Sequence, residues 1–154
     1  WSNALFIHVF MIFIGSSVAP SIYNSAQRVK ETITPKEVAF LRFLPEIAEE
    51  DAIIVSLVDD GHYIEYFSHR KTVADTNFLQ IEDAKQRIKD INTLFTTQSK
   101  SIATKIMNKY HARYIYISPT AKKLYGINYL SYEDNDCFQL LYVGDVRLYK
   151  STCE

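Results

Sequence analysis

The segment Ala52-Ile53-Ile54-Val55-Ser56-Leu57-Val58-Asp59-Asp60-Gly61 passes from an apolar, β-branched run into two acidic residues and a glycine. An apolar run of this length predicts a strand that is buried on both faces, as in a parallel sheet. In open α/β sheets, ligands bind in the crevice beyond the carboxyl ends of such strands. The sequence therefore predicts an α/β fold whose functional residues follow directly after residue 57.

The overall composition fits one folded domain and argues against nucleic acid as a partner. Hydrophobic residues make up 47% of the 154 residues and aromatic residues 14%, which is enough for a packed core. The net charge is -1, and the one basic cluster, residues 69–71, is too small to attract a phosphate backbone.

Local start and stop signals place the secondary structure along the chain. Thr34 and Glu37 have the spacing of a capping box, and Pro45 should kink or end the helix that they open. Gly126 should close a later helix. Further helices are expected at 60–67, 83–95, from 99 onward and at 120–125, and extended segments at 52–57, 72–74, 114–117, 138–143 and 146–149. This order predicts an α/β fold with a small central mixed sheet flanked by helices and a C-terminal β-hairpin.

The N-terminal region has a different character. Residues 5–14 are apolar except for His8, but this run is shorter than the roughly 20 residues that span a bilayer. We interpret residues 1–20 as the end of a transmembrane or hydrophobic helix, in which Ser2-Asn3-Ala4 resembles a remnant of tag cleavage. A buried helix of a soluble domain and an interfacial segment are the alternatives. Residues 21–154 then form a single α/β extracytoplasmic domain.

The two cysteines, Cys137 and Cys153, flank the predicted hairpin. They do not form a Cys-x-x-Cys pair, which argues against a structural zinc site. A turn at Gly144-Asp145 pairs Cys137 near Thr152, so a disulfide would need a bulge or a diagonal geometry. A disulfide would indicate an oxidising compartment, and two reduced, buried thiols are the alternative.

Four residues are the predicted acceptor or substrate contacts: Asp59, Asp60, His62 and Arg70. A carboxylate at the strand end can accept a hydrogen bond from an acceptor hydroxyl or a sugar, and Arg70 can bind a phosphate. The alternatives are structural. Asp59 or Asp60 could cap the following helix, and Arg70 could pair with Asp75 in a solvated loop, where Asp75 and Asn77 are expected to form Asx-type turns.

A metal site is a weaker hypothesis. On a helix over residues 60–69, His62, Glu65 and His69 share one face and could ligate a divalent ion for a metal-dependent hydrolase. The spacing is not His-Glu-x-x-His, and solvated polar residues give the same pattern.

The strand, the Asp59-Asp60-Gly61-His62-Tyr63-Ile64 segment and the following Arg70-Lys71-Thr72-Val73-Ala74-Asp75 segment resemble those of oligosaccharyltransferase catalytic subunits and related GT-C glycosyltransferases. The resemblance covers about residues 34–150. In that family the strand runs into Trp-Trp-Asp-Tyr-Gly, which recognises the acceptor hydroxyl. Here Leu57-Val58 replaces the tryptophan pair, Asp59 matches the aspartate and Asp60 stands in the tyrosine position.

The resemblance implies a soluble extracytoplasmic domain of a multi-spanning membrane glycosyltransferase. Such a domain helps to position the acceptor or the lipid-linked sugar donor, and its partners are these two substrates and the membrane-embedded remainder of its own chain. The catalytic carboxylates, and a divalent cation such as Mg or Mn, would belong to the parent enzyme outside this domain, so the isolated domain should be inactive. The alternative is an extracellular binding domain anchored by a single helix, without catalysis.

Overall fold

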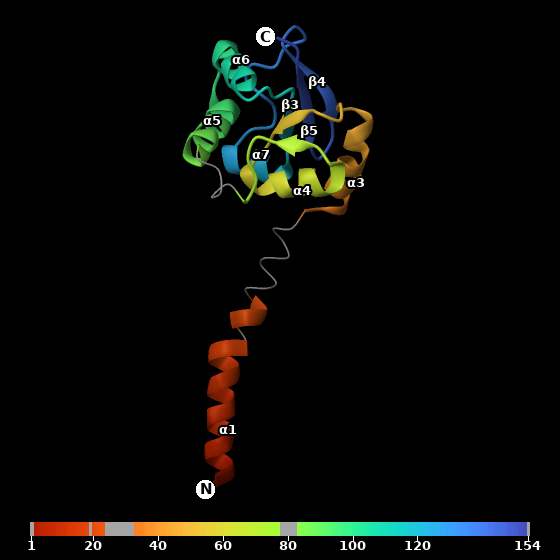
Figure 1. Ribbon diagram of the computed structural model, residues 1–154. Helices are drawn as coiled ribbons and strands as arrows, with labels where there is room; N and C mark the ends of the chain where they lie inside the picture. Colours follow the sequence, from red (N-terminus) through yellow and green to blue (C-terminus); the bar gives the residue numbers. More distant parts are fainter. Residues whose placement is uncertain (1, 19, 24–32, 78–82, 154) are drawn as a thin grey trace. The chain divides into compact units, whose positions relative to one another are not determined.

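The computed structural model describes residues 2–18, 20–23, 33–77 and 83–153. The chain divides into two compact units, Trp1–Ile33 and Thr34–Glu154 (Figure 1). The first unit contains α1 (Ser2–Phe13) and a short π-helical segment, η1 (Ile14–Val18). The second unit contains every strand of the described chain and the helices from residue 35 onward.

The N-terminal helix is apolar along its length. The segment Ala4–Tyr23 has a mean hydropathy of 1.9 and is long and apolar enough to cross a membrane. None of it is buried, and large side chains such as Leu5 and Phe6 are about seven-tenths exposed. The described helix is therefore apolar and exposed, and a signal sequence would pass the same test of length and composition.

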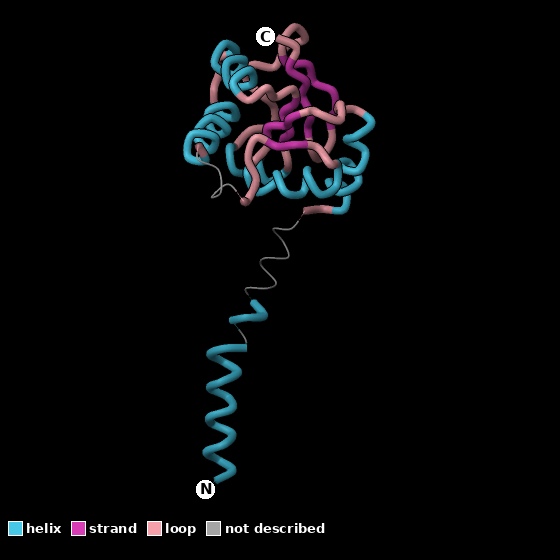
Figure 2. Tube along the Cα trace, viewed as in Figure 1, coloured by secondary structure: helices cyan, strands magenta, loops and turns pink. Residues whose placement is uncertain are grey.

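A five-stranded mixed sheet forms the centre of the second unit (Figure 2). Its strand order is β2-β1-β3-β5-β4, with β1 parallel to both β2 and β3, and β5 antiparallel to both β3 and β4. The strands are β1 (Ile53–Val55), β2 (Lys71–Thr72), β3 (Tyr114–Ile117), β4 (Phe138–Val143) and β5 (Arg147–Ser151). The predicted α/β class and the C-terminal strand pair are confirmed.

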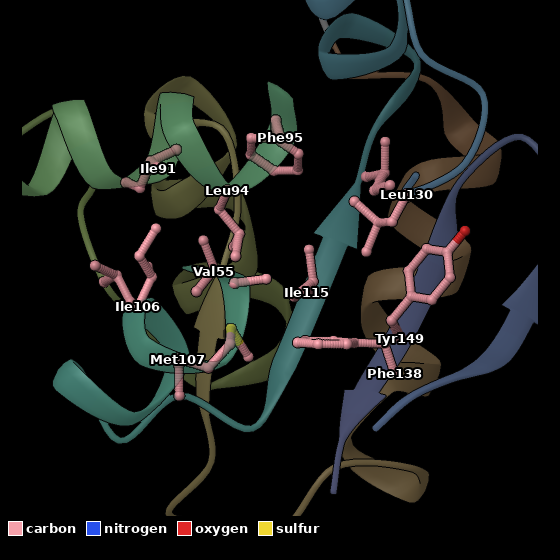
Figure 3. Packing of buried hydrophobic residues seen from close by; sticks show 14 of the residues in the cluster. Val55, Ile91, Leu94, Phe95, Ile106, Met107, Ile115, Leu130, Phe138 and Tyr149 are labelled. Carbon is pink, nitrogen blue, oxygen red and sulfur yellow. The ribbon is translucent and has the colours of Figure 1, made fainter. Parts of the chain in front are cut away.

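Helices cover both faces of this sheet. Consecutive side chains of β3 point to opposite faces and contact different helices. Tyr116 packs against Phe40 of α3, whereas Ile115 lies in the larger apolar cluster with Leu94 and Met107 (Figure 3). The helices of the second unit are α3 (Pro35–Phe43), α4 (Val58–Ser68), α5 (Ala84–Thr96), α6 (Lys100–Lys109) and α7 (Pro119–Tyr125).

The predicted helix boundaries at α3 and α7 are confirmed by their caps. The Thr34 hydroxyl accepts a hydrogen bond from the Glu37 backbone N–H at 3.2 Å, and Glu37 accepts one from the Thr34 backbone N–H at 2.9 Å. Pro45 lies in a 3₁₀ turn, η2 (Leu44–Glu46), that ends α3. Gly126 closes α7 in the left-handed region, with φ of 65°.

The junction between β1 and α4 differs from the prediction. The strand is shorter than residues 52–57, and α4 begins at Val58 with Leu57 as its N-cap. The prediction that Asp59 or Asp60 caps this helix is therefore wrong, because both lie inside its first turn. In the first turn, a negative side chain is stabilised by the unpaired backbone N–H groups of the helix start, although it does not act as the N-cap.

The C-terminal hairpin contains a disulfide between Cys137 and Cys153, whose Cα atoms are 4.8 Å apart. The connection has three residues rather than two, since Val143 pairs with Arg147. A bulge between Leu140 and Tyr142 then shifts the register back by one residue. The longer turn and the bulge offset each other, so the Thr152 N–H still donates to the Cys137 carbonyl, beside Cys153.

Candidate functional site

The acidic pair lies where the chain leaves β1, but its two carboxylates have different environments. Asp59 is exposed, whereas Asp60 is 9% exposed. Consecutive residues on a helix point about 100° apart, so α4 directs one carboxylate to solvent and the other toward the sheet. Of these two carboxylates, only that of Asp59 is accessible to a ligand.

Asp60 belongs to a buried polar cluster that also contains Glu37, Tyr116 and Ser118. Burial raises the pKa of Asp60 to about 7; the Ser118 hydroxyl lowers it, and the charges of Glu37 and Asp59 raise it further. Among the described residues, neither the Asp60 Oδ2 atom nor the Tyr116 hydroxyl has a hydrogen-bond partner. Burial, followed by the charges of Asp60 and Glu37, also raises the pKa of Tyr116.

Gly61 sets the distance between α4 and the segment that follows β2. A Cβ atom at this position would lie 2.6 Å from the Ala74 carbonyl oxygen and 2.8 Å from the Asp75 Cα atom. Only glycine allows the helix to approach that backbone so closely. The two segments that carry the family resemblance are therefore in direct contact.

Asp75 and Asn77 form the predicted Asx-type turn. The Asp75 Oδ1 atom accepts a hydrogen bond from the Asn77 backbone N–H at 2.8 Å, and its Oδ2 atom accepts one from the Asn77 amide at 3.3 Å. The turn fixes both side chains beside α4.

Arg70 braces the backbone in this structure. Its guanidinium donates hydrogen bonds to the carbonyl oxygens of Ala48, Ser68 and Pro45 at distances of 3.0 to 3.3 Å. Nε and both terminal nitrogens are engaged, which leaves little of the fork for a phosphate. The alternative ion pair with Asp75 does not form among the described residues either.

The predicted face of α4 lines a surface hollow of about 700 Å³, which we name the α4 hollow. His62, Glu65 and Tyr66 lie along the helix, His69 is its C-cap, and Asp75 and Asn77 face them from the Asx turn. The α4 hollow thus brings together His62, Glu65 and His69, and it also contains Tyr66, a residue that is 74% exposed.

The described residues contain no group of three His, Cys, Asp or Glu side chains that could hold a metal ion, so the structure gives no support to metal binding by His62, Glu65 and His69. His69 lies past the end of α4 in a left-handed conformation, with φ of 54°, so it leaves the helical face. Glu65 already accepts a hydrogen bond from the Thr72 hydroxyl at 2.9 Å.

The partners of Asp60 were also missed from the sequence. Glu37 was assigned only to the capping box, and Tyr116 was placed in the predicted strand at 114–117 without any link to Asp60. The signal that could have found them is the arrangement of parallel β1 and β3, whose carboxyl ends meet at one edge of the sheet.

Comparison with known proteins identifies the fold. No protein-family model and no curated protein matches the sequence. Among solved structures, the chain is similar to the crystal structure of the C-terminal globular domain of the oligosaccharyltransferase AglB from Archaeoglobus fulgidus. The TM-score is 0.59 at 19% identity, and the match covers 79% of this chain and 99% of that chain. The resemblance drawn from Asp59-Asp60-Gly61 is confirmed at the level of the fold: this chain has the fold of an archaeal oligosaccharyltransferase C-terminal globular domain.

Proposed function

We propose that this chain is the extracytoplasmic domain of an oligosaccharyltransferase-like membrane glycosyltransferase and helps to position the acceptor or the lipid-linked sugar donor. One observation carries the proposal. In a fold shared with an oligosaccharyltransferase domain, Asp59 presents an exposed carboxylate at the start of α4, where the family resemblance expects the acceptor-binding aspartate.

The chemistry of Asp59 suits an acceptor hydroxyl. An ionised carboxylate in the first helical turn can accept a strong, charge-assisted hydrogen bond, and the helix dipole favours its negative charge. Leu57 is buried and Val58 is half-buried where the family has two tryptophans, so no aromatic wall stands beside Asp59 at these positions. We therefore propose an acceptor that differs from the sequon of the family.

Catalysis is assigned to the rest of the parent protein. The domain supplies a binding carboxylate, while the catalytic carboxylates and a divalent cation such as Mg or Mn belong to the membrane-embedded part. The disulfide between Cys137 and Cys153 supports an oxidising, extracytoplasmic location, and the apolar Ala4–Tyr23 helix supports attachment to a membrane.

The test compares the parent protein with this chain alone. Membranes that contain the full parent protein and Mg²⁺ should transfer sugar from a lipid-linked donor to a hydroxyl- or amide-bearing acceptor peptide. The 154-residue chain in detergent, with the same substrates, should transfer none. Transfer by the chain alone would contradict the division of labour, and an inactive parent would contradict the proposed reaction.

A single-helix-anchored binding domain is the second candidate, because one described helix has the length and composition of a membrane span. The upstream part of the parent reading frame separates the two. Many apolar segments of roughly 20 residues favour the glycosyltransferase, and one segment favours the anchored binding domain.

A further inference from the structure

We propose that the α4 hollow is a binding subsite for a neutral, hydroxyl-rich ligand, of which a single pyranose unit of a sugar is the best match. The hollow has a volume of about 700 Å³, the scale of a small-molecule site. His62, which contributes to it, lies one helical turn after Asp59 on α4. The inference concerns binding alone and does not require the proposed transferase reaction.

The walls of the α4 hollow are held in place by contacts within the protein. Gly61 fixes α4 against Asp75, and Asp75 in turn fixes Asn77 through two hydrogen bonds. Thr72 donates to the Glu65 Oε1 atom, which orients that carboxylate. A site whose polar groups are already oriented loses little conformational entropy when a ligand binds. Such a site can therefore bind a specific ligand more tightly than an open, mobile surface can.

Two further features distinguish the lining of the α4 hollow. His69 adopts a left-handed conformation at the C-cap, where glycine is preferred and a side chain costs roughly 1 kcal/mol. The His62 Nδ1 atom is buried and has no hydrogen-bond partner among the described residues. Both histidines line the hollow, so a strained backbone and an unsatisfied nitrogen occur at one place, as is common at binding sites.

The charges around the α4 hollow select against an anion. The lining has two carboxylates, Glu65 and Asp75, and one guanidinium, Arg42. Arg42 also lies over the ring of Phe67, at 5.6 Å from its centroid. A phosphate or an acidic sugar would face a surplus of negative charge, whereas hydroxyl groups can donate to both carboxylates.

The exposed side chain of Tyr66 provides the apolar surface that a sugar ring would contact. Its 74% exposure leaves a flat apolar surface beside the polar wall, and its edge-on contact with Phe67, with ring centroids 5.0 Å apart, limits its movement. A pyranose has an apolar C–H face and a rim of hydroxyl groups. An aromatic face next to carboxylate and amide groups therefore matches both sides of such a ligand.

The test is saturation-transfer difference NMR on the whole 154-residue chain, in a detergent without a sugar headgroup. The probes are the methyl glycosides of glucose, mannose, galactose and N-acetylglucosamine, with glucuronic acid as the anionic comparison. The matched variants are Tyr66→Ala and Tyr129→Ala; Tyr129 is another exposed tyrosine, and it does not line the hollow. Asn77→Ala is a second variant in the hollow.

The proposal predicts that at least one neutral glycoside binds more tightly than glucuronic acid. Its Kd should rise about tenfold or more in Tyr66→Ala and in Asn77→Ala, and stay unchanged in Tyr129→Ala. No binding by any neutral glycoside, tighter binding of glucuronic acid, or equal loss in Tyr66→Ala and Tyr129→Ala would overturn it. An inactive transferase would leave these binding results unaffected, so the two proposals fail separately.

Discussion

Gly61 packs against Asp75 so closely that a Cβ atom on the glycine would lie 2.8 Å from the Cα atom of the aspartate. This contact joins the start of α4, which carries Asp59, to the turn that carries Asp75 and Asn77. The exposed carboxylate and the α4 hollow are therefore parts of one rigid arrangement.

The contact makes Gly61→Ala a destabilising substitution. The added methyl group meets the backbone of Ala74 and Asp75, which cannot rotate away, so we expect a loss of about 2 kcal/mol in the free energy of unfolding. Urea unfolding measures it. Gly144→Ala is the matched control, because its nearest neighbours are atoms of the Tyr142 side chain, which can move. Equal losses of unfolding free energy in the two variants would show that α4 does not pack tightly against the backbone of Ala74 and Asp75.

The buried carboxyl of Asp60 predicts a distinctive pH dependence. Its pKa rises from 3.8 in the unfolded chain to about 7 in the fold, so the folded state holds an extra proton between these values. Stability contributed by this group is full below about pH 4 and is lost as the pH rises toward 7. Asp60→Asn removes the titration, since the amide stays neutral.

The measurement is the free energy of unfolding of wild type and Asp60→Asn from pH 4 to pH 8. The difference should change in favour of the asparagine by a few kcal/mol, at about 1.4 kcal/mol per pKa unit. Taking the difference cancels Glu49 and Asp134, whose lowered pKa values act in the acid range. A difference that is constant with pH would show that Asp60 is solvated in the folded protein.

Arg70 should contribute to stability through its backbone contacts. Arg70→Ala leaves the carbonyl groups of Pro45, Ala48 and Ser68 without their charged donor, and we expect a loss of about 2 kcal/mol. Arg113→Ala is the control, because that side chain is exposed and its ion pair with Asp51 measures 3.8 Å. Thermal unfolding measures the loss of stability in both variants. A role limited to phosphate binding would leave Arg70→Ala as stable as Arg113→Ala.

The disulfide should stabilise the domain mainly by restricting the unfolded chain. Cys137 and Cys153 are 16 residues apart, and closing a loop of this size contributes about 3 kcal/mol. Reduction by dithiothreitol should lower Tm in wild type and have no effect on the double variant Cys137→Ala/Cys153→Ala. An unchanged Tm on reduction of wild type would mean that the two cysteines are not bonded in solution.

Local sequence signals predicted many of the elements. The helix starts at Thr34 and Ser99 and the closing glycine at 126 each depend on residues within one turn of the helix end. The apolar strand at 114–117 likewise carries its own pattern. Such features need no knowledge of the rest of the chain.

The errors concern residues whose role depends on distant partners. Asp60 is enclosed by Glu37, Tyr116 and Ser118, which come from other segments of the chain. Arg70 donates to carbonyl groups 22 and 25 residues earlier in the chain. The start of α4 was also misplaced, since Leu57 and Val58 continue the apolar pattern of the strand and hide the helix boundary. A pattern in sequence gives the order of elements, but not which polar side chains the packing encloses.

The most direct test of the proposed function is sugar transfer by membranes containing the parent protein with Asp59→Asn. Asp136→Asn, at another exposed aspartate, is the matched control. If Asp59 holds the acceptor hydroxyl, Asp59→Asn should lower the rate of transfer by roughly tenfold to a hundredfold, the loss of one charged hydrogen bond, while Asp136→Asn retains the wild-type rate. A wild-type rate in Asp59→Asn, with both variants equally stable, would contradict the assignment of this domain to acceptor positioning through Asp59.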